Sequence, residues 1–420
     1  MPRPVHLLAS SSGKPEPGRL HPLLLAIALA CPAAGVEVVD PVMVGGIPIN
    51  PAGDLRDIEH RFEVHPKALL GGGWNSTPTV PPANDSGPDT YSRGLVGILL
   101  RYHPRPGLDA MLDAELERLK YREHAELDTN AGMLRGGFDY VAPELSWSGD
   151  AVWRRSQETL LTTGEQVAQD HSRLRTRFGH DSAYWWEDAD LSVSHLDYRQ
   201  GTTSFDQTEG DHTTYAADLR LGIAEGDDRG FLAVRSEVVR YSVDDRFNDC
   251  TALTTTVGCV LMTTARSNLH LEAGLELRRY ADDYLHEADN GDQLALAPWW
   301  DLGGTWSWRE GDRLGARLYS DLTDSLTSNA TWSIGGELSS HIELSARLAV
   351  EAVVDLSETR DGGLNVAGTA VQRRIVQGSL AGRYAVIEGL ALRLRTTAVR
   401  VQADDGYDRL LFAVDLAYVY

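Results

Sequence analysis

Residues 410–420 read LLFAVDLAYVY, and this closing stretch decides the fold. Side chains on a β-strand alternate between two faces with a period of two. Arg409 and Asp415 fall on one face of this stretch. A strand of about ten residues with one apolar face is typical of a membrane-spanning β-strand. The apolar face consists of Leu410, Phe412, Val414, Leu416, Tyr418 and Tyr420.

Composition is compatible with a chain that crosses a membrane through strands. The 420 residues are 42% hydrophobic, and after the N-terminus the sequence has no run of about twenty apolar residues of the kind a membrane helix needs. In a barrel, the polar side chains of the lumen dilute the lipid-facing ones, so the mean hydropathy stays low. The formal charge of -22 argues against binding to nucleic acid, which requires a basic surface.

The N-terminus reads as a secretory leader. The apolar run LHPLLLAIALA (residues 20–30) follows Arg3, Lys14 and Arg19 and precedes the small residues CPAAG. This pattern predicts a signal peptide over residues 1–35. Cys31 raises lipidation as a less favoured alternative. Residues 36–62, rich in proline and glycine, are predicted to form a periplasmic tail, and residues 63–420 the barrel.

Period-two alternation recurs from Ala68 to the C-terminus, for example in Leu269, Leu271 and Leu275 against His270 and Glu272. Counting these runs predicts an all-β fold: a single transmembrane, antiparallel, up-and-down barrel of about eighteen strands, with sixteen as the alternative. Short and long connections alternate along the chain, which predicts short periplasmic turns and longer extracellular loops. The short connections are predicted at 103–107, 141–144, 179–182, 265–268, 309–313, 339–341 and 386–389, and the long ones at 75–89, 200–210, 244–254, 286–292 and 358–366.

The polar face of the predicted strands would line a lumen. A barrel of this size leaves an aqueous interior unless a segment plugs it. An acidic early strand and arginine-bearing later strands would favour ions of one sign at a constriction. The alternative is a wall of polar groups that pair with one another. The lumen-facing candidates are Asp109, Asp113, Glu115, Glu117, Arg313, Arg317, Arg347, Arg373, Arg383, Arg393, Arg395 and Arg409.

Cys250 and Cys259 bracket the segment CTALTTTVGC. If this segment is a surface loop in an oxidising compartment, the two cysteines would form a small-loop disulfide. The alternative is two unrelated thiols.

Two segments resemble a known group of proteins. The stretch FEVHPKALLGGGWNST (residues 62–77) looks like the opening strand, and LLFAVDLAYVY like the closing strand, of large bacterial outer-membrane β-barrel proteins, including the poorly characterised barrels of exopolysaccharide biosynthesis and export loci. The resemblance implies insertion by the outer-membrane assembly machinery through the C-terminal strand. It also implies contact with outer-membrane lipids and lipopolysaccharide and a role beside polysaccharide export components. It carries over no catalytic residue.

These patterns predict a porin-like pore or export conduit for hydrophilic solutes or polysaccharide. The alternative is a plugged barrel with a structural or partner-binding role at the cell surface. No nucleophile, metal or phosphate motif is recognisable, so the sequence predicts neither an enzyme nor a cofactor, metal or nucleic-acid site. A lipid-hydrolysing barrel with a role for His286 is a third and weaker alternative.

Overall fold

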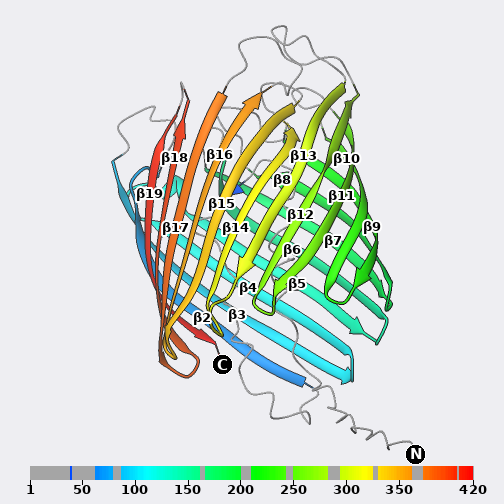
Figure 1. Cartoon of the computed structure of the whole chain (residues 1–420). Coiled ribbons are helices and arrows are strands. Elements are labelled where there is room, and N and C mark those ends of the chain that lie inside the picture. Colours follow the sequence, from blue (N-terminus) through cyan, green and yellow to red (C-terminus); the bar gives the residue numbers. More distant parts are fainter. Residues whose placement is uncertain are drawn as a thin grey trace, which may run out of the picture.

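The chain folds into one closed β-barrel (Figure 1). The computed structural model describes residues 38–39, 62–78, 87–160, 166–199, 210–242, 249–281, 294–324, 330–361, 372–403 and 406–419. Each barrel strand pairs antiparallel with its sequence neighbours, which confirms the expected up-and-down barrel of eighteen strands. The strands are β2 (Phe62–Asn75), β3 (Asp89–Arg105), β4 (Leu108–Tyr121), β5 (Thr129–Val141), β6 (Leu145–Leu160), β7 (Gln166–Asp181), β8 (Trp185–Tyr198), β9 (His212–Glu225), β10 (Asp228–Tyr241), β11 (Cys250–Thr264), β12 (Ser267–Tyr280), β13 (Leu294–Trp306), β14 (Arg313–Asp324), β15 (Ala330–Ser345), β16 (Leu348–Asp361), β17 (Gln372–Ile387), β18 (Leu390–Gln402) and β19 (Asp408–Val419).

The last strand closes the barrel against the first. β19 pairs antiparallel with β2, and the register runs from Phe412 opposite Trp74 to Tyr418 opposite Ala68. Closure removes the two free sheet edges, whose backbone groups would have no hydrogen-bond partner in lipid. The apolar face predicted from residues 410–420 therefore continues the outer surface of the barrel.

Two short elements lie outside these eighteen strands. β1 (Val38–Val39) pairs with residues 159–160 of β6, and a 3-10 turn, η1 (Ala125–Leu127), follows β4. None of the helical segments in the described ranges is long and apolar enough to cross a membrane. The predicted signal peptide and His286 lie outside the described residues.

The outer face of the barrel is apolar because alternate residues of each strand point away from the lumen. Leu70 and Ile223 are each 72% exposed, and Leu116 is 67% exposed. Exposure of so many large aliphatic side chains is incompatible with water and is typical of a lipid-facing surface. The outer face thus marks the barrel as membrane-spanning.

Aromatic side chains form a belt on the outer face near one end of the barrel. Trp147 packs edge-on against Phe138, with ring centroids 4.7 Å apart, and stacks on Phe178 at 5.5 Å. These residues lie close to the connections 142–144 and 182–184. Aromatic rings concentrate where a bilayer meets water. The belt therefore places one membrane interface near the short-turn end of the barrel.

Short turns join the strands at one end, and longer connections join them at the other (Figure 1). Gly107 and Gly389 occupy two of the short turns with φ of 78° and 76°. A residue with a side chain is strained at such angles, so glycine allows the chain to reverse within two residues. We call the two ends the short-turn end and the long-loop end.

Two predicted connections are wrong in position, and one turn was not predicted. Residues 339–341 lie inside β15, where Ser339 and His341 are polar because they face the lumen, and the real turn is residues 346–347. β11 begins at Cys250, so the predicted loop 244–254 extends too far. The turn at Gly226, between β9 and β10, was not predicted.

The predicted disulfide is also wrong. Cys250 and Cys259 lie on the same strand, β11, and are not bonded to each other. Nine positions along a strand separate them by about 30 Å, whereas a disulfide needs Cα atoms within about 7 Å. Their separation is an odd number of residues, so Cys250 faces the lumen and Cys259 faces outward.

Candidate functional site: the charged lumen wall

The inner face of the barrel carries most of its charged side chains, and this wall is the candidate functional site. Most of the predicted lumen candidates lie on it. Arg347 does not, because it occupies the exposed β15–β16 turn. The sequence predicted it on the wall because the period-two pattern continues across this turn of two residues. Asp109, Asp113, Glu115 and Glu117 lie on β4, Arg313 and Arg317 on β14, Arg373 and Arg383 on β17, Arg393 and Arg395 on β18, and Arg409 on β19.

The acidic row of β4 is largely neutralised by neighbouring strands. The Nζ of Lys67, on β2, donates to Asp113 Oδ1 at 2.7 Å and to Glu115 Oε1 at 2.8 Å. Nearer the short-turn end, Asp109 Oδ1 lies 2.6 Å from His103 Nδ1. Removing charges from water is costly unless they are paired. The acidic row therefore contributes less negative field to the lumen than its sequence suggests.

Two of the predicted arginines have clear local partners. Arg317 makes a bidentate pair with Asp301 on β13, with both N–O distances at 2.9 Å. Arg409 donates from Nε to the carbonyl oxygen of Thr77 at 3.0 Å and lies over the ring of Tyr407. These contacts brace adjacent parts of the wall, and they leave the two guanidinium groups less available to a solute.

Four arginines lie close together on the arc where the barrel closes. Arg393 lies directly opposite Asp415 on β19 and directly opposite Arg383 on β17. Arg395 and Arg93 are further electrostatic neighbours of Arg393 and of Asp415. We call Arg93, Arg383, Arg393 and Arg395 the arginine cluster.

The arginine cluster has more positive than negative charge. Its acidic neighbours are Asp415, 3.6 Å from Arg93 Nε, and Glu117, 3.2 Å from the same atom. Among the described residues, four guanidinium groups lie beside two carboxylates. At about 4 Å, two unit charges interact by roughly 1 kcal/mol in water and roughly 4 kcal/mol at an effective dielectric constant of 20. An anion beside these arginines would relieve their mutual repulsion.

The sequence reasoning missed a second arginine row, on β7. Arg173, Arg175 and Arg177 alternate with Leu174 and Thr176, a period-two pattern that was available in the sequence. Each arginine is matched by an aspartate on a neighbouring strand. Arg173 contacts Asp150 at 3.3 Å, Arg177 contacts Asp188 at 3.5 Å, and Arg175 forms an ion pair with Asp190.

A balanced network also covers the wall from β9 to β12. Glu272 is 1% exposed and accepts a hydrogen bond from Thr256 Oγ1 at 2.5 Å. Arg235 Nη2 lies 3.3 Å from Glu272 Oε1 and Arg220 Nη2 lies 3.7 Å from Glu272 Oε2. Within the described ranges, no three His, Cys, Asp or Glu side chains are placed to share a metal ion. The arginine cluster thus contrasts with the paired wall elsewhere.

Comparison with known proteins finds similar solved structures but no family. No protein-family model matches the chain, and no curated protein matches it significantly. Solved structures that are similar include OccAB4 of Acinetobacter baumannii (TM-score 0.47, 10% identity, 85% of this chain and 97% of that one), OpdL of Pseudomonas aeruginosa (0.46, 10%, 86% and 98%) and the siderophore receptor PirA of Pseudomonas aeruginosa (0.44, 9%, 85% and 80%). At these identities and TM-scores, the similarity does not assign a family or a function.

Proposed function

We propose that the protein is an outer-membrane conduit for hydrophilic solutes, with a preference for anions. A closed barrel satisfies all its backbone hydrogen bonds and presents an apolar outer face, as a protein in the bacterial outer membrane must. The arginine cluster is the observation that carries the preference, because it gathers four guanidinium groups beside two carboxylates on the inner wall. Fixed charge on a pore wall raises the local concentration of counter-ions.

Among hydrophilic anions, we propose acidic polysaccharide as the cargo. Successive carboxylates along such a polymer would exchange between Arg393, Arg395 and Arg383, which lie on adjacent strands. Guanidinium groups bind carboxylates through paired hydrogen bonds, and several weak contacts allow a chain to move on. The assembly machinery of the outer membrane and polysaccharide export components are the partners that this function would require.

The test is ion selectivity in planar lipid bilayers. Under a salt gradient, the R393A/R395A double variant should lower the anion-to-cation permeability ratio about twofold or more, because two fixed positive charges leave the wall. The matched control is R393K/R395K, which keeps both charges and should keep the wild-type ratio. An unchanged reversal potential in the alanine variant would exclude the arginine cluster as a selectivity element, and protein without any conductance would exclude an open conduit.

A second measurement distinguishes a pore that carries acidic polysaccharide from a pore that merely prefers anions. Acidic oligosaccharides such as oligogalacturonate should block the wild-type current at lower concentration than neutral maltooligosaccharides do. The R393A/R395A variant should lose that difference. Equal block by acidic and neutral oligosaccharides would leave a simple anion pore and refute the acidic polysaccharide.

A further inference from the structure

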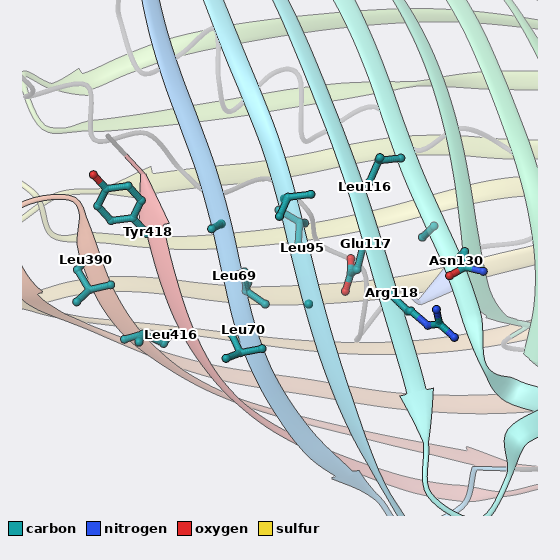
Figure 2. A pocket seen from close by; sticks show the side chains of 14 residues that line it. Leu69, Leu70, Leu95, Leu116, Glu117, Arg118, Asn130, Leu390, Leu416 and Tyr418 are labelled. Atoms are coloured by element: carbon teal, nitrogen blue, oxygen red, sulfur yellow. The ribbon is translucent and has the colours of Figure 1, made fainter.

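A groove crosses the lipid-facing surface of the barrel at the closing strands. It has a volume of about 680 Å³ and is lined by residues of β2 to β5, β18 and β19. Figure 2 shows Leu70, Leu116, Leu390, Leu416 and Tyr418 around it. Its lining is almost wholly hydrocarbon, which suits an acyl chain and not a water-soluble ligand.

Small residues make the floor of the groove. Gly94 lies between Leu70 on β2 and Arg118 on β4 in one row across the sheet. A Cβ atom added at Gly94 would meet only the carbonyl oxygen of Leu69, at 4.0 Å. The space above Gly94 is therefore empty, while Leu70 and Leu116 rise on either side of it, 72% and 67% exposed.

Two cations stand at the long-loop end of the groove. Arg118 and Lys120 are exposed and point outward, and both lie in the last four residues of β4, which ends at Tyr121. Within the part of the chain that the structure describes, neither has an ion-pair partner, and the residues directly opposite them on β3 and β5 are Gly94, Ser92 and Asn130. The outer surface here offers two positive charges with no carboxylate to neutralise them.

Two other outward-facing arginines near the long-loop end are neutralised. Arg400 pairs with Asp408 at 2.7 Å, and Arg155 pairs with Asp170 at 2.8 Å. The unneutralised Arg118 and Lys120 are thus distinctive in lying beside an apolar groove. Apolar lining and a cationic end together match a lipid that carries a phosphate.

We propose that this groove binds one molecule of lipid A, the phosphorylated glycolipid of the outer leaflet. An acyl chain lies over Gly94 between Leu70 and Leu116, and a phosphate on the sugar headgroup contacts Arg118 and Lys120. The long-loop end faces the outer leaflet in an outer-membrane barrel, which is where this lipid resides. The inference rests on the outer-membrane location proposed above, but not on conduction through the lumen.

The test is lipid binding to delipidated barrel, measured by native mass spectrometry in mild detergent. Wild-type protein should retain one lipid A molecule with an affinity well above that for lipid A from which both phosphates have been removed. A cation near a membrane surface contributes about fivefold to binding of an anionic lipid, so R118A/K120A should weaken lipid A binding about 25-fold. G94L should also abolish the specific adduct, because leucine fills the open space.

The matched control is R279A. Arg279 is likewise exposed, points outward at the long-loop end of β12 and has no ion-pair partner among the described residues, but it does not line the groove. This variant should bind lipid A like the wild type. Heat-modifiable migration on gels checks that each variant is folded.

Three results would overturn the proposal. Wild-type affinity in both R118A/K120A and G94L would show that the groove is not the site. Equal loss in R279A would show only diffuse attraction to the barrel surface. Equal binding of phosphatidylglycerol and lipid A would assign the groove to phospholipid instead. If G94L fails to fold, R118A/K120A decides alone, because both side chains project into lipid or water.

Discussion

Single side chains hold the short turns in shape, and Asp312 is the clearest case. Its carboxylate accepts a hydrogen bond from the backbone amide of Glu343 at 2.7 Å and pairs with Arg309. Burial acts to raise the pKa of Asp312, but the hydrogen bonds from Arg309 and Glu343 outweigh it and leave the pKa below its ordinary value of 3.8. The charged carboxylate thus ties the β13–β14 turn to the end of β15.

The variant D312N should lower the unfolding temperature of the barrel by roughly 2–4 °C at neutral pH. Because the folded-state pKa is lowered, the stabilisation is present above 3.8 and is lost as the pH falls through the folded-state value. The difference between variant and wild type should therefore shrink as the pH drops below 3.8. This difference in unfolding temperature is measured by heating both proteins through a range of temperatures at each pH and following heat-modifiable migration on gels.

The control for this prediction is E310Q. Glu310 lies in the same turn but is exposed and has no partner among the described residues. Its substitution should leave the unfolding temperature unchanged. A loss of stability in E310Q equal to that in D312N would attribute the effect to net charge and not to the hydrogen bonds of Asp312.

Strands were predictable in number and in facing because period-two alternation survives across the whole barrel. With Tyr420 taken as outward-facing, the sequence alternation predicts that Arg409 and Asp415 face inward, and both are buried on the inner wall. Turn positions were less predictable. At 346–347 the alternation runs straight through two turn residues, whereas the polar Ser339 and His341 imitate a turn inside β15.

The charges of the site could be located from sequence, but their pairing could not. Lys67 and Asp113 lie 46 positions apart, and only the stagger of β2, β3 and β4 brings them to 2.7 Å. The cluster of Arg93 with Arg393 likewise depends on closure between β2 and β19, which no local pattern encodes. Sequence alone therefore placed arginines on the later strands but could not show which β4 carboxylates are paired or that Arg93 joins the cluster.

Close contact between strands makes some glycines essential, and Gly274 on β12 is one. A Cβ atom there would lie 2.7 Å from the Cα of Thr256 on β11 and closer still to the carbonyl oxygen of Thr255. We expect G274A to push β11 and β12 apart and to lower the yield of folded, heat-modifiable barrel severalfold. Refolding into detergent micelles, followed on gels, measures that yield.

Gly382 on β17 provides the comparison, because an added Cβ there meets no atom within 4 Å. The variant G382A should fold as well as the wild type. If G274A and G382A lowered the yield of folded barrel equally, the effect would come from reduced flexibility of the strand backbone and not from the lack of space at Gly274.

At the scale of the whole molecule, closure between β19 and β2 forms both proposed functional surfaces, the arginine cluster and the lipid-facing groove. It seals the hydrogen-bonded wall, brings Asp415 and Arg393 next to Arg93 inside, and brings Tyr418 and Leu416 next to Leu70 outside. The arginine cluster and the lipid-facing groove therefore lie on opposite faces of the same closing arc. Opening this arc should disrupt both at once.

A cross-link tests the closure directly. Leu69 and Ala417 are directly opposite one another on β2 and β19 and are buried together on the inner face of the barrel, so a small, membrane-permeable oxidant is needed to reach them. In a background with Cys31, Cys250 and Cys259 replaced by serine, the pair L69C/A417C should form a disulfide in native membranes, because opposed residues have Cβ atoms about 4.5–5.5 Å apart. The offset pair L69C/A413C, separated by about 13 Å along the strand, should stay reduced.

Protease cleavage in the loop region, followed by non-reducing gels, reports the cross-link as fragments that remain joined. Joined fragments in the offset pair, or none in the matched pair, would mean that β19 and β2 do not meet in this register in the membrane.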